Sequence, residues 1–182
     1  MKQLVKVAVL PALALIFLAA CSNVHTNDSG SKEDSQVVAA ENATPVAGIQ
    51  LKDDKLNALY QQYVQLTTAL TQGNVKEARF AGNAIEAGAR EVKGGESLVA
   101  SAAKITATAD IEEQRAAFSA LSNDLVALIK QSGLHSGQLY VDFCPMAMND
   151  KGAVWLSGDK AIQNPYFGEK MMTCGEVKET IQ

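Results

Sequence analysis

Residues 53–72, DDKLNALYQQYVQLTTALTQ, carry the pattern that decides the fold. Leucine or tyrosine recurs there at steps of three and four residues, which places these side chains along one face of an α-helix. The positions are Leu56, Leu59, Tyr63, Leu66 and Leu70. A helix with a single apolar face buries it against a neighbour, so this stretch predicts a helix that packs against others.

Three further segments downstream repeat the helical pattern. Asn74 and Asp110 stand before two of them as expected N-caps, each with a glutamate three residues later, as in a capping box. Four amphipathic helices with short connections predict a mainly α fold, an antiparallel four-helix bundle. The three further helices are expected over residues 75–92, 96–106 and 111–131.

The pattern changes character near the C-terminus. Residues 139–143 alternate apolar and polar side chains, as a strand does, and residues 153–156 can form a second strand. Residues 167–173 are expected to form a helical turn. The sequence therefore predicts a small β-hairpin or irregular module over residues 138–178, as part of a single domain that spans residues 49–182.

The N-terminus has the features of a bacterial lipoprotein signal. Residues 1–20 combine a short basic start with an apolar stretch, and they end in the lipobox Leu18-Ala19-Ala20-Cys21. We expect Cys21 to be lipidated and to anchor the chain to a membrane. Residues 21–48 are polar and aperiodic, as expected of a flexible tether. Ser22 after the cysteine favours the outer membrane of the bacterial cell envelope, with the domain facing the periplasm.

Composition and motifs exclude several function classes. The formal net charge is −4 and no basic patch is present, so nucleic acid is not an expected partner. The chain has two histidines, and it lacks the motifs of haem attachment, zinc proteases, phosphate loops and serine hydrolases. We therefore expect a protein that is not an enzyme.

The sulfur-containing residues are clustered. After the signal peptide, every methionine lies within four residues of Cys144 or Cys174, and the long helical region has neither residue type. Thiolate and thioether sulfurs are soft ligands that suit Cu(I), or Ag(I), which shares its preferences. The four methionines are Met146, Met148, Met171 and Met172.

The spacing of these residues predicts a four-sulfur site. If the strand continues beyond Cys144, its period of two places Met146 on the same face as the cysteine. A helical turn likewise brings Met171 and Cys174 to one face. The expected ligands are thus Cys144, Met146, Met171 and Cys174. Secondary candidates are Met148, Met172 and the loop residue His135.

A disulfide between Cys144 and Cys174 is the alternative interpretation. Paired cysteines in exported domains usually form disulfides, and this one would close a loop of about 30 residues, worth roughly 3–4 kcal/mol. The protein would then be a structural or interaction lipoprotein that binds no metal. A redox-sensitive pair that binds Cu(I) only when reduced reconciles the two interpretations.

The C-terminal motifs resemble a bacterial domain family of unknown function. Its members appear as small exported proteins or lipoproteins, and a similar module is attached to periplasmic adaptor subunits of heavy-metal efflux systems of the resistance-nodulation-division type. The resemblance covers residues 51–181 and is most specific over residues 140–175. The matching motifs are Phe143-Cys144-Pro145-Met146-Ala147, residues 152–157, Ile162-Gln163-Asn164-Pro165-Tyr166-Phe167-Gly168, and Met171 with Cys174-Gly175.

The resemblance implies a helical bundle associated with copper or silver efflux. It singles out Cys144, Met146, Met171 and Cys174, whereas Met148 and Met172 stand where the family pattern has other apolar residues. The chain lacks the hairpin, lipoyl and barrel parts of an efflux adaptor. The implied role is therefore that of a partner of an adaptor, not of the adaptor itself.

Overall fold

The helical region begins at residues with strong capping signals. The structure, a computed structural model, describes residues 48–182. Asp53 caps α1 (Asp54–Thr71), because its side chain accepts a hydrogen bond from the Leu56 N–H. Asn74 caps α2 (Val75–Ala89) in the same way, through the Glu77 N–H. Residues 1–47, with the predicted signal peptide, Cys21 and nearly all of the tether, lie outside the described residues.

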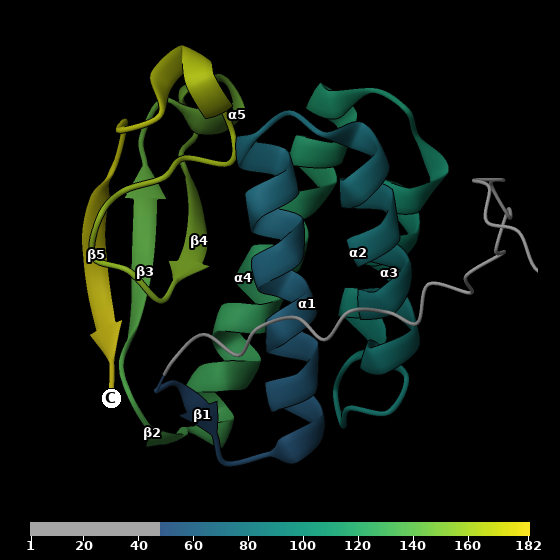
Figure 1. Cartoon of the computed structure of the whole chain (residues 1–182), viewed down its shortest axis with the longest axis vertical. Coiled ribbons are helices and arrows are strands. Elements are labelled where there is room, and N and C mark those ends of the chain that lie inside the picture. Colours follow the sequence, from purple (N-terminus) through teal and green to yellow (C-terminus); the bar gives the residue numbers. More distant parts are fainter. Residues whose placement is uncertain (1–47) are drawn as a thin grey trace, which may run out of the picture. The chain divides into compact units, whose positions relative to one another are not determined.

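Two further helices complete the bundle. They are α3 (Glu96–Ala107) and α4 (Ile111–Ser132), and the side chain of Asp110 caps α4 by accepting from two backbone N–H groups. Each helix packs against the next along the chain, and α4 also contacts α1 (Figure 1). The predicted four-helix bundle is confirmed. The observed helix ends differ from the predicted ones by at most three residues.

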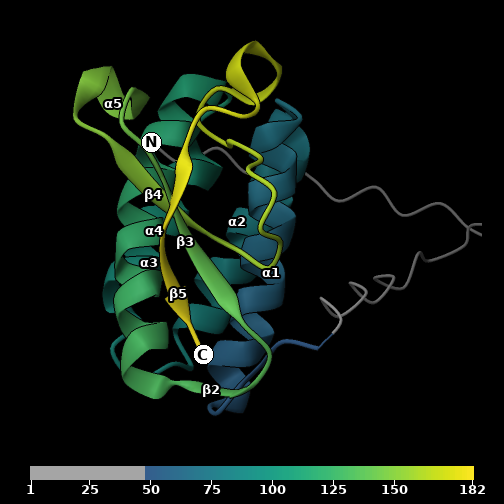
Figure 2. The same cartoon turned by 90° about the vertical axis from the view of Figure 1, so that its left-hand side faces the viewer.

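A small three-stranded sheet covers one side of the bundle. Its antiparallel strands β3 (Leu139–Cys144), β4 (Ala153–Ser157) and β5 (Glu176–Ile181) lie in the order β4-β3-β5. The sheet stands beside α1 and α4, away from α2 and α3 (Figures 1 and 2). The predicted hairpin of β3 and β4 is confirmed, and β5 was not predicted.

Short elements connect these layers. A second small sheet pairs β1 (Gln50–Leu51) with β2 (Leu134–Ser136), and neither strand was predicted. The element α5 (Ala147–Asp150) is a left-handed turn, because Met148, Asn149 and Asp150 all have positive φ. The predicted helical turn is the 3₁₀ helix η1 (Gly168–Met171).

An aromatic row links the bundle to the sheet. Successive rings lie 5.4 to 6.3 Å apart, which is within the usual range for contacting aromatic pairs. The row runs through Tyr60, Tyr63, Phe118, Tyr166 and Trp155, all buried. Bundle and sheet therefore share one hydrophobic core.

Candidate metal site

Cys144 and Cys174 lie in direct contact. Their Sγ atoms are 2.8 Å apart, and both residues are free cysteines. Cys144 is fully buried at the end of β3, where it pairs with Ala153 of β4, and Cys174 is half-buried just before β5. The fold thus brings together the two thiols that the sequence singled out.

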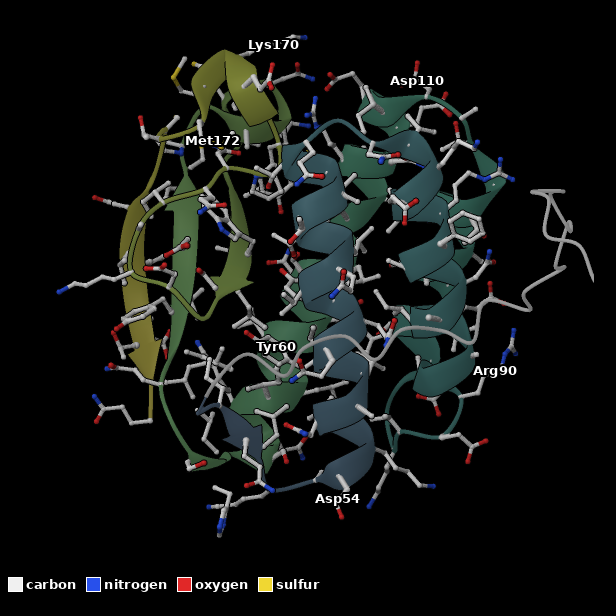
Figure 3. The ribbon with its side chains drawn as sticks, viewed as in Figure 1. Asp54, Tyr60, Arg90, Asp110, Lys170 and Met172 are labelled. Carbon is white, nitrogen blue, oxygen red and sulfur yellow. The ribbon has the colours of Figure 1, made fainter. Side chains whose placement is uncertain are left out.

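The turn before Cys174 has the predicted form. The N–H of Cys174 donates to the carbonyl of Met171 at 3.1 Å, which closes one tight turn after η1. Met171 and Met172 are both half-buried beside this turn. Met172 lies at the η1 end of the sheet (Figure 3).

The chain after Cys144 differs from the prediction. Strand β3 ends at Cys144, so the alternation of a strand does not relate Cys144 to Met146. Pro145, which cannot donate a backbone hydrogen bond, begins a turn instead. Met146 in this turn is 48% exposed, whereas Met148 is half-buried and packs against the core. The condition for that arrangement, a strand that continues beyond Cys144, is not met, although both methionines lie in the loop that starts at Cys144.

His135 is not brought to the cysteines. It is exposed in β2, four residues before the start of β3. Cys144 is the last residue of β3, and six strand residues span roughly 17 Å. In Figure 1, β2 lies at the opposite end of the sheet from α5. His135 is therefore not placed to share a ligand set with Cys144.

Asp142 is a buried carboxylate, although the alternation predicted over residues 139–143 places it on the polar side of the strand. Leu139 and Val141 are buried as the alternation predicts, but the alternation shifts by one residue after Val141, where the pairing with β5 is irregular. Asp142 is therefore fully buried, and Phe143 is half-exposed beneath the ammonium group of Lys178. Neither carboxylate oxygen of Asp142 has a hydrogen-bond partner among the described residues. Burial raises the pKa of Asp142 to about 7. Polar alternation alone gave no signal that this carboxylate lies inside.

The electrostatics of the thiol pair favour its protonated form. Contact with Cys144 is the main cause that raises the pKa of the Cys174 thiol above its ordinary value, and burial adds to it. Because a metal ion binds the thiolate, binding releases protons, and affinity for a metal should increase with pH.

The side chains grouped with the cysteine pair limit which metal ion could bind there. Among residues 48–182, no group of three or more histidine, cysteine, aspartate or glutamate side chains is placed to hold a metal ion. Zinc sites are built from those residue types, whereas Cu(I) also accepts thioether sulfur. Methionine sulfur is therefore the side-chain donor left to serve as a further ligand beside the two cysteines.

A separate groove of about 300 Å³ lies between α1 and β4. The hydroxyls of Thr67, Thr68 and Thr71 line it, and each donates to a carbonyl one turn earlier in α1. Trp155 and Asp159 line the opposite wall, and none of its lining residues is a cysteine or a methionine. The groove is thus distinct from the thiol pair.

Comparison with known proteins gives one result. Residues 59–137 match the model of DUF3347, a protein of unknown function. No curated protein and no solved structure matches the chain. The matched range runs from α1 to the end of β2 and stops before Cys144, so it covers the helices and not the C-terminal motifs. No helix among the described residues is long and apolar enough to cross a membrane.

Proposed function

We propose that the protein captures Cu(I), or Ag(I), outside the cytoplasm and is not an enzyme. The observation that carries the proposal is the 2.8 Å contact between Cys144 Sγ and Cys174 Sγ at the end of the domain that also holds its methionines. Two thiols from segments 30 residues apart meet there. Met146, two residues after Cys144, and Met171, whose carbonyl accepts from the Cys174 N–H, complete the proposed ligand set.

Metal binding requires a small adjustment of the thiol pair. Two metal–thiolate bonds of roughly 2.3 Å, the zinc value, at a tetrahedral angle separate the sulfurs by about 3.8 Å. The metal-free pair is closer than that. Cys144 pairs with Ala153 of β4 and follows Phe143, which pairs on both sides of the strand. We therefore expect Cys174, in its half-buried turn, to be the residue that moves.

A competition titration tests this proposal. Residues 22–182 omit the thiol of Cys21, and Cu(I) is titrated against a chromophoric chelator with and without reductant. We expect one tight equivalent in the reduced wild type and none in Cys144→Ser/Cys174→Ser. Met146→Leu and Met171→Leu should weaken Cu(I) binding roughly tenfold or more, because leucine keeps the volume and removes the donor.

Matched controls separate ligands from packing residues. Met148→Leu and Met172→Leu make the same chemical change in the same two segments and should leave the Cu(I) affinity within about twofold of wild type. If the reduced wild type does not compete with the chelator for Cu(I), the proposal is wrong.

The same contact favours a second candidate, a disulfide-stapled interaction protein. The two sulfurs are already within about 1 Å of the length of a disulfide bond. In that case the protein isolated from the envelope contains no free thiol at Cys144 or Cys174, and the methionine substitutions change stability alone. Alkylation of thiols before and after reduction, read by mass spectrometry, distinguishes the two candidates.

We further propose that Cys21 carries a lipid, that the protein faces the periplasm from the outer membrane, and that it exchanges metal with a periplasmic efflux adaptor. The lipobox and the resemblance of the C-terminal motifs support these proposals. Cys21→Ala should release the protein from the membrane fraction and abolish incorporation of a labelled fatty acid. Unchanged membrane association of this variant contradicts a lipid anchor.

A further inference from the structure

The Asn164-Pro165-Tyr166 motif has no role in the ligand set, yet it contacts the cysteine turn directly. Asn164 is fully buried. Its side-chain amide Nδ2 donates to the carbonyl of Cys174 at 2.7 Å, and its Oδ1 accepts from the N–H of Tyr166 at 2.8 Å. Both ends of the amide are thus used, and the donor end holds the backbone of a candidate ligand.

The backbone of Asn164 holds the same turn. Its N–H donates to the carbonyl of Met172 at 2.8 Å, and its carbonyl accepts from the N–H of Gly168 at 2.9 Å. One residue therefore contacts the start, middle and end of the segment from Gly168 to Cys174. Three of its four hydrogen bonds join it to that segment.

The motif is itself fixed to both layers of the domain. The carbonyl of Pro165 accepts from Arg115 Nε of α4 at 2.9 Å. The hydroxyl of Tyr166 donates to the carbonyl of Val154 in β4 at 2.6 Å. Val154 is the neighbour of Ala153, which pairs with Cys144. The motif thus links the turn of Cys174 to the strand pair that holds Cys144.

We propose that Asn164 is a positioning residue that holds the thiol of Cys174 against that of Cys144. Without the Nδ2 donor, the carbonyl of Cys174 loses this bond, and the turn keeps the 3.1 Å bond from the Cys174 N–H to Met171. The turn then samples positions in which the two sulfurs are apart, and the effective concentration of one thiol at the other falls. The consequence for Cu(I) rests on the proposed function, whereas the consequence for the thiol pair does not.

Two variants at one position test the inference. Asn164→Ala removes both ends of the amide. Asn164→Asp keeps the acceptor for the Tyr166 N–H and replaces the donor by an oxygen, so it isolates the bond to Cys174. If Asn164→Ala does not fold, Asn164→Asp alone tests whether the bond to Cys174 positions the thiol.

Asn74→Ala is the matched control. It deletes the same atoms from an asparagine whose Oδ1 also caps a backbone N–H, but in the helical bundle. It should lower the free energy of unfolding by about 1 kcal/mol. If the loss of any asparagine cap were enough to change the thiol pair through a general loss of stability, Asn74→Ala would show the same change.

The measurements are made on residues 22–182 of each protein. The first is the equilibrium between the dithiol and the Cys144–Cys174 disulfide in glutathione buffers without metal, which reports the effective concentration of the thiols. The second is Cu(I) affinity by chelator competition. We expect both Asn164 variants to lower the disulfide equilibrium constant and the Cu(I) affinity about tenfold, with Asn74→Ala unchanged in both.

The outcomes separate the inference from the proposed function. If the wild type does not bind Cu(I), the proposed copper function is wrong. If the dithiol–disulfide equilibrium is nevertheless shifted in Asn164→Asp, the positioning role of Asn164 is supported. Values within about twofold of wild type for both Asn164 variants overturn the positioning role, whatever the Cu(I) result. An equal change in Asn74→Ala overturns it as well.

Discussion

The hydroxyl of Tyr63 in α1 accepts a hydrogen bond from the backbone N–H of Leu156 in β4 at 3.0 Å, across 93 residues of sequence. The same oxygen lies 2.8 Å from Ser122 Oγ in α4. A single buried phenol thus joins the two helices that face the sheet to the strand that covers them. This bond satisfies an edge-strand N–H that would otherwise be buried without a partner.

Loss of this hydroxyl should destabilise the domain. Tyr63→Phe leaves the Leu156 N–H and the Ser122 hydroxyl without their partner in the core. We expect the free energy of unfolding to fall by about 1–3 kcal/mol. Urea denaturation followed by circular dichroism measures the change, and an unchanged midpoint contradicts the joining role of Tyr63.

Tyr60 provides an internal comparison for that measurement. It is also buried, but its hydroxyl has no hydrogen-bond partner among the described residues. Tyr60→Phe removes the same atom and relieves an unsatisfied group. We therefore expect it to be neutral or to stabilise the fold by roughly 1 kcal/mol. An equal decrease of the free energy of unfolding in Tyr60→Phe and Tyr63→Phe would contradict the hydrogen-bonding role of the Tyr63 hydroxyl.

Asp142 should make the metal-free protein less stable as pH rises. Its folded-state pKa of about 7 lies above the ordinary value of 3.8 for an aspartate. Between these values the folded state holds a proton that the unfolded state has lost, so the free energy of unfolding decreases with pH and is lowest above pH 7. Asp142→Asn does not titrate and should flatten this slope, with a gain on the order of 2–4 kcal/mol at pH 8.

Chemical denaturation at pH 4, 6 and 8 provides the test. Asp150→Asn makes the same chemical change at an exposed carboxyl group and serves as the control. If wild type and Asp142→Asn show parallel pH profiles, Asp142 does not carry the buried charge inferred from its position.

Gly168 should tolerate no side chain. Its φ is +57°, and a Cβ there would lie 2.5 Å from the carbonyl oxygen of Thr71 and 2.9 Å from the guanidinium of Arg115. The obstacle is partly backbone, so it cannot rotate away. Gly168→Ala should lower the free energy of unfolding by more than about 2 kcal/mol.

The same substitution at Gly88 should have the opposite sign. Gly88 lies in α2 with open space around the position of a Cβ. Gly88→Ala should therefore stabilise the protein by roughly 0.5–1 kcal/mol, because alanine favours the helix. Thermal unfolding of both variants checks the pair, and a shift in the same direction contradicts the structural distinction.

Cu(I) should stabilise the reduced protein by mass action. A ligand that binds only the folded state adds roughly 2.7 kcal/mol to the free energy of unfolding when its free concentration is about 100 times its dissociation constant. Thermal unfolding of the wild type with Cu(I) and excess reductant should show this gain. Cys144→Ser/Cys174→Ser should show none, and Zn²⁺ is the control for nonspecific thiol binding.

The helices could be predicted closely from sequence, whereas the path of the chain around the cysteines could not. Local spacing fixed the helix starts, because Asn74 and Asp110 act on N–H groups two or three residues away. The pairing of β3 with β5 is irregular between Val141 and Asp142, so a strict alternation placed Asp142 and Phe143 on the wrong sides. Strand β5 was missed because its charged sequence forms a strand only beside β3.

The sequence by itself determined a bundle of four amphipathic helices and the gathering of sulfur residues into two short segments. Both are properties of neighbours along the chain. Tertiary structure alone decided that Cys144 touches Cys174 and that Asn164 bonds to the turn of Cys174. These relationships join residues 10 to 30 positions apart, and their geometry is set by the docking of the sheet on α1 and α4, which no local pattern encodes.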